Sequence, residues 1–286
     1  MERRSLVRIL AAIAILGWGA AAHASEVQWG ASLDAALREA KKSGKPILID
    51  FYADWCGWCK RLDQDVYTDD SVVRTSKQFI NVKLDTDRNG RDAARQYGVR
   101  SLPTILVLDA NGEVEARFRG YMPAPVFNSK LNQTIQAHRA MPGLLSRFRR
   151  SATDLDAASQ LTRIYAGRGQ EEQAQRTLAR VAKLDPSDEK GKYARSLNSV
   201  ADMYASRGNL DEAIALFRRS VKVGKRSDEI SYGQLSLALC RLSRRDVSGA
   251  RSELKTAIAH PRIGEKYKSD ARKMLAELDN LAKQGI

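Results

Sequence analysis

The sequence predicts an α/β domain followed by an all-α domain. Up to about residue 140, short apolar runs typical of buried strands alternate with segments of helical spacing, as in a mixed sheet covered by helices on both faces. Beyond that point the strand patterns stop and paired helical patterns recur. With 286 residues, the chain is long enough for each domain to have its own hydrophobic core.

Elements of the first domain are expected in the order helix, strand, helix, strand, helix, strand, strand, helix. Apolar residues at 33, 36, 37 and 40 have helical spacing, and Gly44 and Pro46 end this helix at about Ser43. The run 47–52 is almost continuously apolar, which is typical of a strand buried on both faces. Further helices are expected from Cys56, at 92–97 and at 125–138, and further strands at 79–84, 104–108 and 114–119.

The second domain contains a repeated two-helix pattern. Tyr165 and Gly169 begin a series that Tyr204 and Gly208 repeat with the same offsets, 39 residues later. A third helical pair is expected at 229–260, although its Ser-Arg-Arg connection breaks the Tyr…Gly spacing, and a last helix is expected at 266–283. The period and the small residues at the helix crossings resemble tetratricopeptide repeats, which implies a stack of helical hairpins around a groove. A helical bundle with no peptide-binding role is the alternative.

The N-terminus has the features of a signal peptide. Arg3, Arg4 and Arg8 form a basic segment, an apolar stretch follows, and Ala22-His23-Ala24 matches a cleavage site. We therefore expect cleavage after Ala24, export by an undetermined route and a periplasmic location, where disulfides persist. Met141-Pro142-Gly143 is expected to separate the two domains. The predicted division is a signal peptide at 1–24, a first domain at 25–140 and a helical domain at 141–286.

Positive charge is concentrated in the helical domain. Residues 141–286 hold 28 Lys and Arg against 18 Asp and Glu, a net of +10, whereas residues 25–140 hold 17 against 15, a net of +2. Such a field suits an acidic protein partner or an anionic surface, and a solvated basic helical surface is the alternative. The export signal argues against nucleic acid as the partner.

Two of the three cysteines form the motif Cys56-Gly57-Trp58-Cys59. A haem attachment site would need His after Cys59, where this sequence has Lys60. A zinc site would need further ligands, but Cys240 lies 181 residues away and the three histidines are scattered, so neither a metal nor another cofactor is expected. Cys240 itself, in an apolar helical segment, is expected to be a buried, inert thiol. A redox pair at the start of a helix that follows a buried strand fits the sequence.

The predicted position gives the two thiols different chemistry. The thiolate is the attacking species in disulfide exchange, and the N-terminal end of a helix stabilises a thiolate there. Cys56, at the helix start, is therefore the expected nucleophile. Cys59, one turn further on, is placed to resolve the mixed disulfide.

The segment 50–60 closely resembles the active-site segment of the thioredoxin superfamily, and its Tyr-Ala-Asp-Trp-Cys part is most similar to the C-terminal domain of the DsbD family. The resemblance extends over about residues 27–138. It implies a thioredoxin-like fold, a buried aspartate at Asp50 that faces Lys83, and a cis-proline at Pro103 beside the cysteines. Trp58 departs from thioredoxin itself, which has proline there, so the reduction potential is not transferable.

Each implied role has a structural alternative. Asp50 is expected to exchange a proton with Cys59, but it could only form an ion pair with Lys83. Trp55, Trp58 and Leu102 are expected to contact substrate, although the tryptophans could serve packing alone. Pro103 could lie in an ordinary turn.

These observations predict an exported thiol–disulfide oxidoreductase. It would reduce or isomerise disulfides of periplasmic proteins and receive electrons from a membrane-bound donor, while the helical repeats recruit a partner. The alternative is an adaptor protein whose thioredoxin-like domain is a redox-responsive module. Metal delivery through the thiol pair is disfavoured because no His or Met lies beside Cys56 and Cys59.

Overall fold

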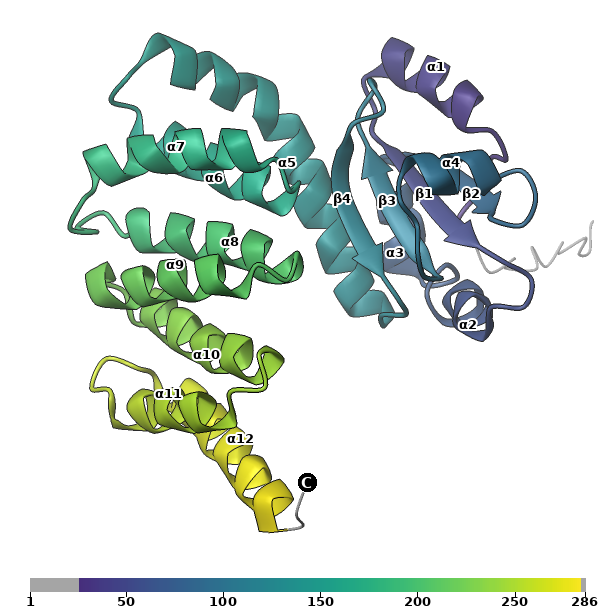
Figure 1. Cartoon of the computed structure of the whole chain (residues 1–286). Coiled ribbons are helices and arrows are strands. Elements are labelled where there is room, and N and C mark those ends of the chain that lie inside the picture. The colour runs from purple at the N-terminus through teal and green to yellow at the C-terminus, as the bar shows by residue number, and fades with distance from the viewer. Residues whose placement is uncertain (1–25, 284–286) are drawn as a thin grey trace, which may run out of the picture.

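The structure, a computed structural model, describes residues 26–283. The expected signal peptide at 1–24 lies outside these residues. A four-stranded sheet with its helices occupies the N-terminal half, and stacked helices make up the rest (Figure 1). Among the described residues, no helix combines the length and the apolar character needed to cross a membrane.

The sheet has the strand order β2-β1-β3-β4. Its strands are β1 (Ile47–Tyr52), β2 (Ile80–Asp85), β3 (Thr104–Leu108) and β4 (Val114–Arg119). The central strand β1 pairs in parallel with β2 and antiparallel with β3, and β3 pairs antiparallel with β4. The sheet is therefore mixed, as predicted, and the C-terminal end of β1 leads directly to the cysteines.

Helices cover both faces of the sheet, and the alternation of side chains along β1 decides which residues meet which helices. Ile47 and Ile49 pack in a core with α1 (Leu33–Ser43) and α4 (Arg91–Gln96). Leu48 points the other way, into a core with α2 (Gly57–Asp65), α3 (Asp70–Ser76) and α5 (Ala124–Arg150). Asp50, two residues after Leu48, shares this second face.

The short helix α3 was not predicted. Asp69 caps it by accepting hydrogen bonds from the backbone N–H groups of Ser71 and Val72, and Val72 and Val73 are buried beneath the sheet. Seven residues with adjacent β-branched side chains have too little periodicity to indicate a helix. The cap and the burial of two valines nevertheless stabilise it in the folded chain.

The predicted end of the last helix of the first domain, at about residue 138, is wrong. Helix α5 continues to Arg150 and includes Pro142. A proline inside a helix removes one hydrogen bond and strains the preceding turn. Leu144, in the added turns, is buried against Leu161 of the next helix, and this packing offsets the loss. The expected exposed break at 141–143 is therefore absent, and the division into domains at 140/141 stays a prediction.

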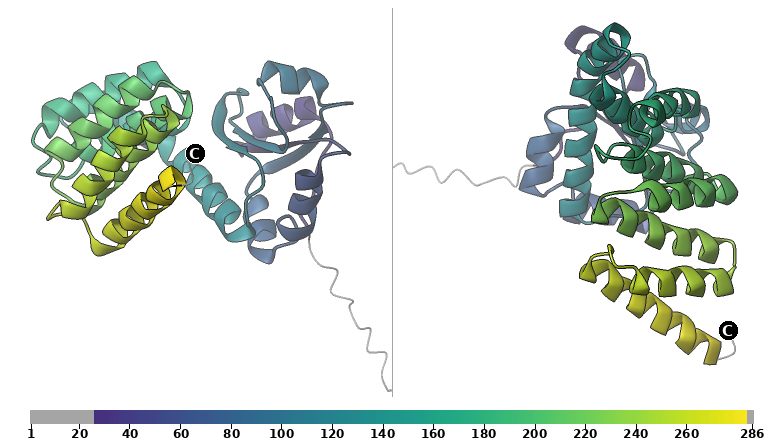
Figure 2. Two further views of the ribbon diagram at one scale, coloured as in Figure 1. Left: turned by 60° about the horizontal axis from the view of Figure 1, so that its bottom comes forward. Right: turned by 90° about the vertical axis from the view of Figure 1, so that its left-hand side faces the viewer.

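Seven further helices stack as successive hairpins (Figures 1 and 2). They are α6 (Leu155–Gly167), α7 (Glu171–Leu184), α8 (Tyr193–Ser206), α9 (Leu210–Val223), α10 (Ser227–Ser243), α11 (Val247–Ala259) and α12 (Glu265–Lys283). One core joins α6 to α10, and a second joins α10, α11 and α12. The pairs and the last helix agree with the predicted helical-repeat region, while the assignment to tetratricopeptide repeats stays a prediction.

The three hairpins share one turn conformation. Gly169 and Gly208 have φ values of 71° and 82°, and Arg245 occupies the corresponding place in the third hairpin with φ 61°. Glycine adopts this left-handed conformation freely, whereas an arginine is strained there. The third connection therefore keeps the geometry of the first two although its sequence differs.

Candidate active site

Strand β1 leads directly to α2 (Figure 1), and both cysteines lie at the start of this helix. Cys56 is the N-cap of α2, with an extended backbone, and its Sγ accepts a hydrogen bond of 3.1 Å from the backbone N–H of Cys59. The two sulfurs form a disulfide with a Cα–Cα distance of 5.3 Å. The sequence prediction of a cysteine pair at a helix start after a buried strand is thus confirmed in position.

The two cysteines differ in access. The exposed fraction is 6% for Cys56 and 1% for Cys59. Cys56, at the helix terminus, is therefore slightly more accessible than Cys59, although both residues are largely buried. Ala53 and Leu102 pack around the pair.

Asp50 is fully buried in β1, and its carboxylate makes no hydrogen bond of normal geometry to the described residues, although the nearby Tyr67 hydroxyl acts to lower its pKa. This burial raises the pKa of Asp50 to about 7 despite the opposing attraction of Lys83. The nearby carboxylate of Asp63 raises the pKa further. A carboxyl group in this state can gain or lose a proton near neutral pH, which is the property that a proton relay requires.

Lys83 has a closer partner than the resemblance implied. Its Nζ lies 3.9 Å from Oδ2 of Asp50, but it donates a hydrogen bond to Asp63 on α2. It also lies 4.8 Å from the ring centroid of Tyr52. Lys83 is therefore shared between two carboxylates rather than paired with Asp50 alone. Asp63 is a site residue that the sequence analysis missed, although its position four residues after Cys59 places it on the same face of the helix.

The loop before β3 closes the other side of the pair. The Leu102–Pro103 peptide bond is cis, as the resemblance implies, and Leu102 packs against the cysteines. The carbonyl oxygen of Pro103 accepts a hydrogen bond of 2.9 Å from the backbone N–H of Gly120, which has φ 73°. The positive φ explains a glycine at this position.

Two tryptophans flank the cysteines on the surface. Trp55 is 71% exposed and Trp58 is 56% exposed. Trp55 donates a hydrogen bond of 2.8 Å from Nε1 to Asp87, so its ring is held in place. Trp58 lies 5.6 Å from the ring of Tyr121 between centroids, and the guanidinium of Arg61 covers both rings. These exposed aromatic rings form an apolar rim beside Cys56. Tyr121 and Arg61 were not predicted to belong to this rim.

The remaining chemical candidates lie elsewhere. Cys240 is buried in α10, and burial raises the pKa of its thiol, so it stays protonated near neutral pH. His138 lies on α5 and contacts Glu115 of β4 rather than the cysteines at the start of α2. Within residues 26–283, no three His, Cys, Asp or Glu side chains come together as a metal site would require.

Comparison with known proteins identifies the class of this domain. Residues 33–135 match the family described as "Thioredoxin-like domain". This part of the chain is therefore a thioredoxin-like domain, which confirms the predicted fold.

Two curated relatives illustrate the similarity. The thiol:disulfide interchange protein DsbD of Citrobacter koseri is 40% identical over 105 residues, 35% of this chain and 18% of that protein. DsbD of Yersinia pestis is 36% identical over 107 residues, 36% of this chain and 18% of that protein. The chain thus spans about a fifth of the length of these relatives.

Solved structures are also similar to this chain. The C-terminal domain of Neisseria meningitidis DsbD in the oxidised form is 24% identical with a TM-score of 0.34, covering 37% of this chain and 99% of that one. A thioredoxin from Thermus thermophilus is 24% identical with a TM-score of 0.38, and the match covers 41% of this chain and 94% of that thioredoxin.

Proposed function

We propose that the chain is an exported thiol–disulfide oxidoreductase that reduces or isomerises disulfides of periplasmic proteins through Cys56 and Cys59. The observation that carries this proposal is the placement of the pair. Cys56 caps α2 and is the more exposed of the two cysteines, and Cys59 is buried one turn inward, beside a cis-proline loop. The similarity of residues 33–135 to a domain of thiol:disulfide interchange proteins supports the same chemistry.

In the reducing direction, the thiolate of Cys56 attacks one sulfur of a substrate disulfide. A mixed disulfide forms, and the other substrate sulfur leaves as a thiolate that takes a proton from solvent. Cys59 then loses its proton and attacks the Cys56 sulfur, which releases the second substrate thiolate and forms the Cys56–Cys59 disulfide. Two electrons pass from the protein dithiol to the substrate, and an external donor must restore the dithiol.

Asp50 is proposed to accept the proton that Cys59 releases. Its pKa of about 7 allows it to take up and return a proton, and it lies on the sheet face that α2 covers. Lys83 and Asp63 are proposed as positioning residues, because together they set the field that the Asp50 carboxyl experiences.

The proposal extends to location and partners. Export rests on the signal-peptide pattern of residues 1–24, and the electron donor is proposed to be membrane-bound by analogy with the DsbD relatives. The stacked hairpins supply no residue to the cysteine site, so they are proposed to recruit a partner.

A trapping experiment tests the proposal. Cys59→Ser should accumulate mixed disulfides between Cys56 and exported proteins, because the resolving thiol is missing, whereas Cys56→Ser should trap none. Wild-type protein should catalyse reduction of insulin by dithiothreitol. If Cys59→Ser retains partners only non-covalently and the wild type leaves insulin oxidised, the chain is an adaptor and the proposed activity is wrong.

A further inference from the structure

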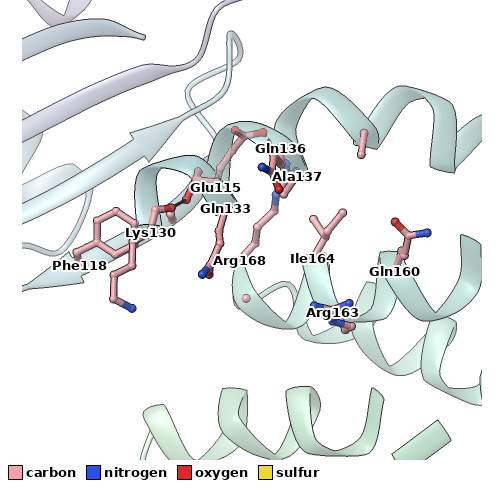
Figure 3. A pocket seen from close by; sticks show the side chains of 14 residues that line it. Glu115, Phe118, Lys130, Gln133, Gln136, Ala137, Gln160, Arg163, Ile164 and Arg168 are labelled. Atoms are coloured by element: carbon pink, nitrogen blue, oxygen red, sulfur yellow. Dashed lines mark hydrogen bonds and ion pairs between the residues drawn. The ribbon is translucent and has the colours of Figure 1, made fainter. Parts of the chain in front are cut away.

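A cleft separates the thioredoxin-like domain from the first repeat helix (Figure 3). Its walls are β4 and α5 on one side and α6 on the other, and its volume is about 480 Å³. Pockets that bind small ligands have volumes of about 300–1,000 Å³, so this cleft can enclose a few side chains of a longer occupant. The cysteine site does not use this cleft, so its lining requires a separate explanation.

The charge in the cleft is unbalanced. The lining contains three cations, Lys130, Arg163 and Arg168, and one carboxylate, Glu115. Glu115 already accepts hydrogen bonds from Arg168 at 2.5 Å and from His138 at 2.9 Å, so this carboxylate is neutralised within the fold. No carboxylate of the described residues lies within ion-pair distance of Lys130 or Arg163, which are both exposed. Two positive charges therefore face the cleft without a counterion from the described chain.

These two cations lie on opposite walls. Lys130 comes from α5 and extends over the ring of Phe118, at 5.6 Å from the centroid, while Arg163 comes from α6 (Figure 3). An occupant that satisfies both must carry at least two negative charges separated across the cleft. An extended acidic peptide meets this requirement, since its side chains alternate along a backbone that rises about 3.3 Å per residue.

The uncharged lining favours a peptide over a small anion. Gln133, Gln136 and Gln160 provide side-chain amides, which can both donate and accept hydrogen bonds as a peptide backbone does. The amide groups of Gln133 and Gln160 donate to residues of their own helices, and their oxygens accept nothing from the described chain. A small anion only accepts hydrogen bonds, so it could not bond to these amide oxygens, whereas a peptide N–H group can. Phe118 and Ile164 add apolar surface for an uncharged side chain.

The cleft is also connected to the cysteine site. β4 runs from the cleft at Phe118 to its end at Arg119, and Gly120 and Tyr121 follow. The ring of Tyr121 contacts that of Trp58 in a tilted arrangement, and Trp58 belongs to the rim beside Cys56. Three residues of extended chain span only about 10 Å. A polypeptide lying across Tyr121 can therefore place one segment at Cys56 and the next in the cleft.

We propose that this cleft binds an acidic, extended segment of the protein whose disulfide reacts at Cys56. Lys130 and Arg163 neutralise two acidic side chains, and the glutamines bond to the peptide backbone. That the occupant is a substrate rests on the proposed function, but its binding does not require the cysteines.

The binding test uses full-length protein with Cys56→Ser and Cys59→Ser, so that no covalent bond can form. The probe is a cysteine-free, fluorescein-labelled octapeptide with three glutamates and two leucines, followed by fluorescence anisotropy. Reversing both charges with Lys130→Glu and Arg163→Glu should weaken binding at least tenfold. The matched control reverses Lys183 and Lys222, two exposed cations on α7 and α9 outside the cleft, and should change affinity less than twofold.

Three outcomes would overturn the inference. The first is equal loss in the cleft variant and in the matched control, which would indicate a general charge effect. The second is equal binding of a peptide with lysines in place of the glutamates. The third is displacement of the peptide by citrate at the same carboxylate concentration, which would identify a site for small anions.

A turnover experiment keeps this inference separate from the proposed function. Wild-type protein is given one disulfide-bonded peptide with, and one without, the acidic octapeptide as a tail. The tail should raise kcat/KM at least fivefold, and the cleft variant should lose this gain while it reduces the untailed peptide normally. If the active wild type does not distinguish the two peptides, the inference is wrong; if neither peptide is reduced, the proposed function fails and the binding result stands alone.

Discussion

Replacement of the buried Asp50 by asparagine should change how stability depends on pH. The pKa of Asp50 is raised from its ordinary value of 3.8 to about 7 in the fold, mainly by burial. Between these two values the unfolded chain has lost the proton and the folded chain has kept it. The unfolded state therefore binds fewer protons, and the free energy of unfolding falls as pH rises from about 4 to 7.

The magnitude follows from the separation of the two pKa values. Each pH unit in this window costs about 1.4 kcal/mol, so the wild type should lose about 4 kcal/mol between pH 4 and pH 7 through this group. Asparagine has no charge to desolvate, so Asp50→Asn should not show this loss. An unpartnered buried amide shifts stability by a constant amount at every pH, and the difference in pH dependence is therefore the quantity to measure.

The assay is urea unfolding of disulfide-intact protein at pH 4, 5, 6, 7 and 8, followed by tryptophan fluorescence. The tryptophans of the described chain, residues 29, 55 and 58, all lie in the thioredoxin-like half, so the signal reports on the half that contains Asp50. Asp34→Asn, at an exposed carboxylate in the first turn of α1, is the control and should follow the wild type. A stability difference between Asp50→Asn and wild type that stays constant from pH 4 to 8 would refute the reasoning, because Asp50 would then ionise as readily in the fold as in the unfolded chain.

Three further predictions concern other parts of the chain. In reduced protein, iodoacetamide should alkylate Cys56 at least tenfold faster than Cys59, with a half-maximal rate below pH 8.5, because Cys56 caps the helix terminus, which stabilises its thiolate, and is the more exposed of the two. Mass spectrometry of quenched samples measures both rates, and equal rates would contradict the assignment of the nucleophile. Arg245→Gly should stabilise the helical part by about 1 kcal/mol in thermal unfolding, since it relieves a left-handed arginine, and Gly208→Arg should destabilise it by a similar amount. Arg168→Ala should lower the free energy of unfolding in urea by about 3 kcal/mol, because it leaves the buried carboxylate of Glu115 without its closest cation. A decrease below about 1 kcal/mol would show that the Arg168–Glu115 ion pair does not hold the two halves together.

Local patterns were sufficient to predict the strands and the cysteine position. The predicted strands at 47–52, 104–108 and 114–119 have the observed bounds. The first two are almost continuously apolar, as strands buried on both faces require, and the third alternates apolar and polar residues, as an edge strand does. The motif at Cys56 and Cys59 follows the first of these strands, so the helix start there was also evident. The charge imbalance between the halves and the 39-residue period are likewise properties of the sequence alone.

Contacts between distant residues decided what the sequence left open. Asp63 became the closer partner of Lys83 because the fold brings this residue of α2 next to Lys83 of β2, 20 residues away in the sequence, a contact that no local spacing reveals. Helix α5 continues through Pro142 because Leu144 packs against Leu161, so tertiary burial outweighed a local helix-breaking signal. The raised pKa of Asp50 and the cleft beside Lys130 have the same origin. The desolvation of Asp50 and the cleft between α5 and α6 both arise only in the folded chain, because both depend on which surfaces pack together and exclude water.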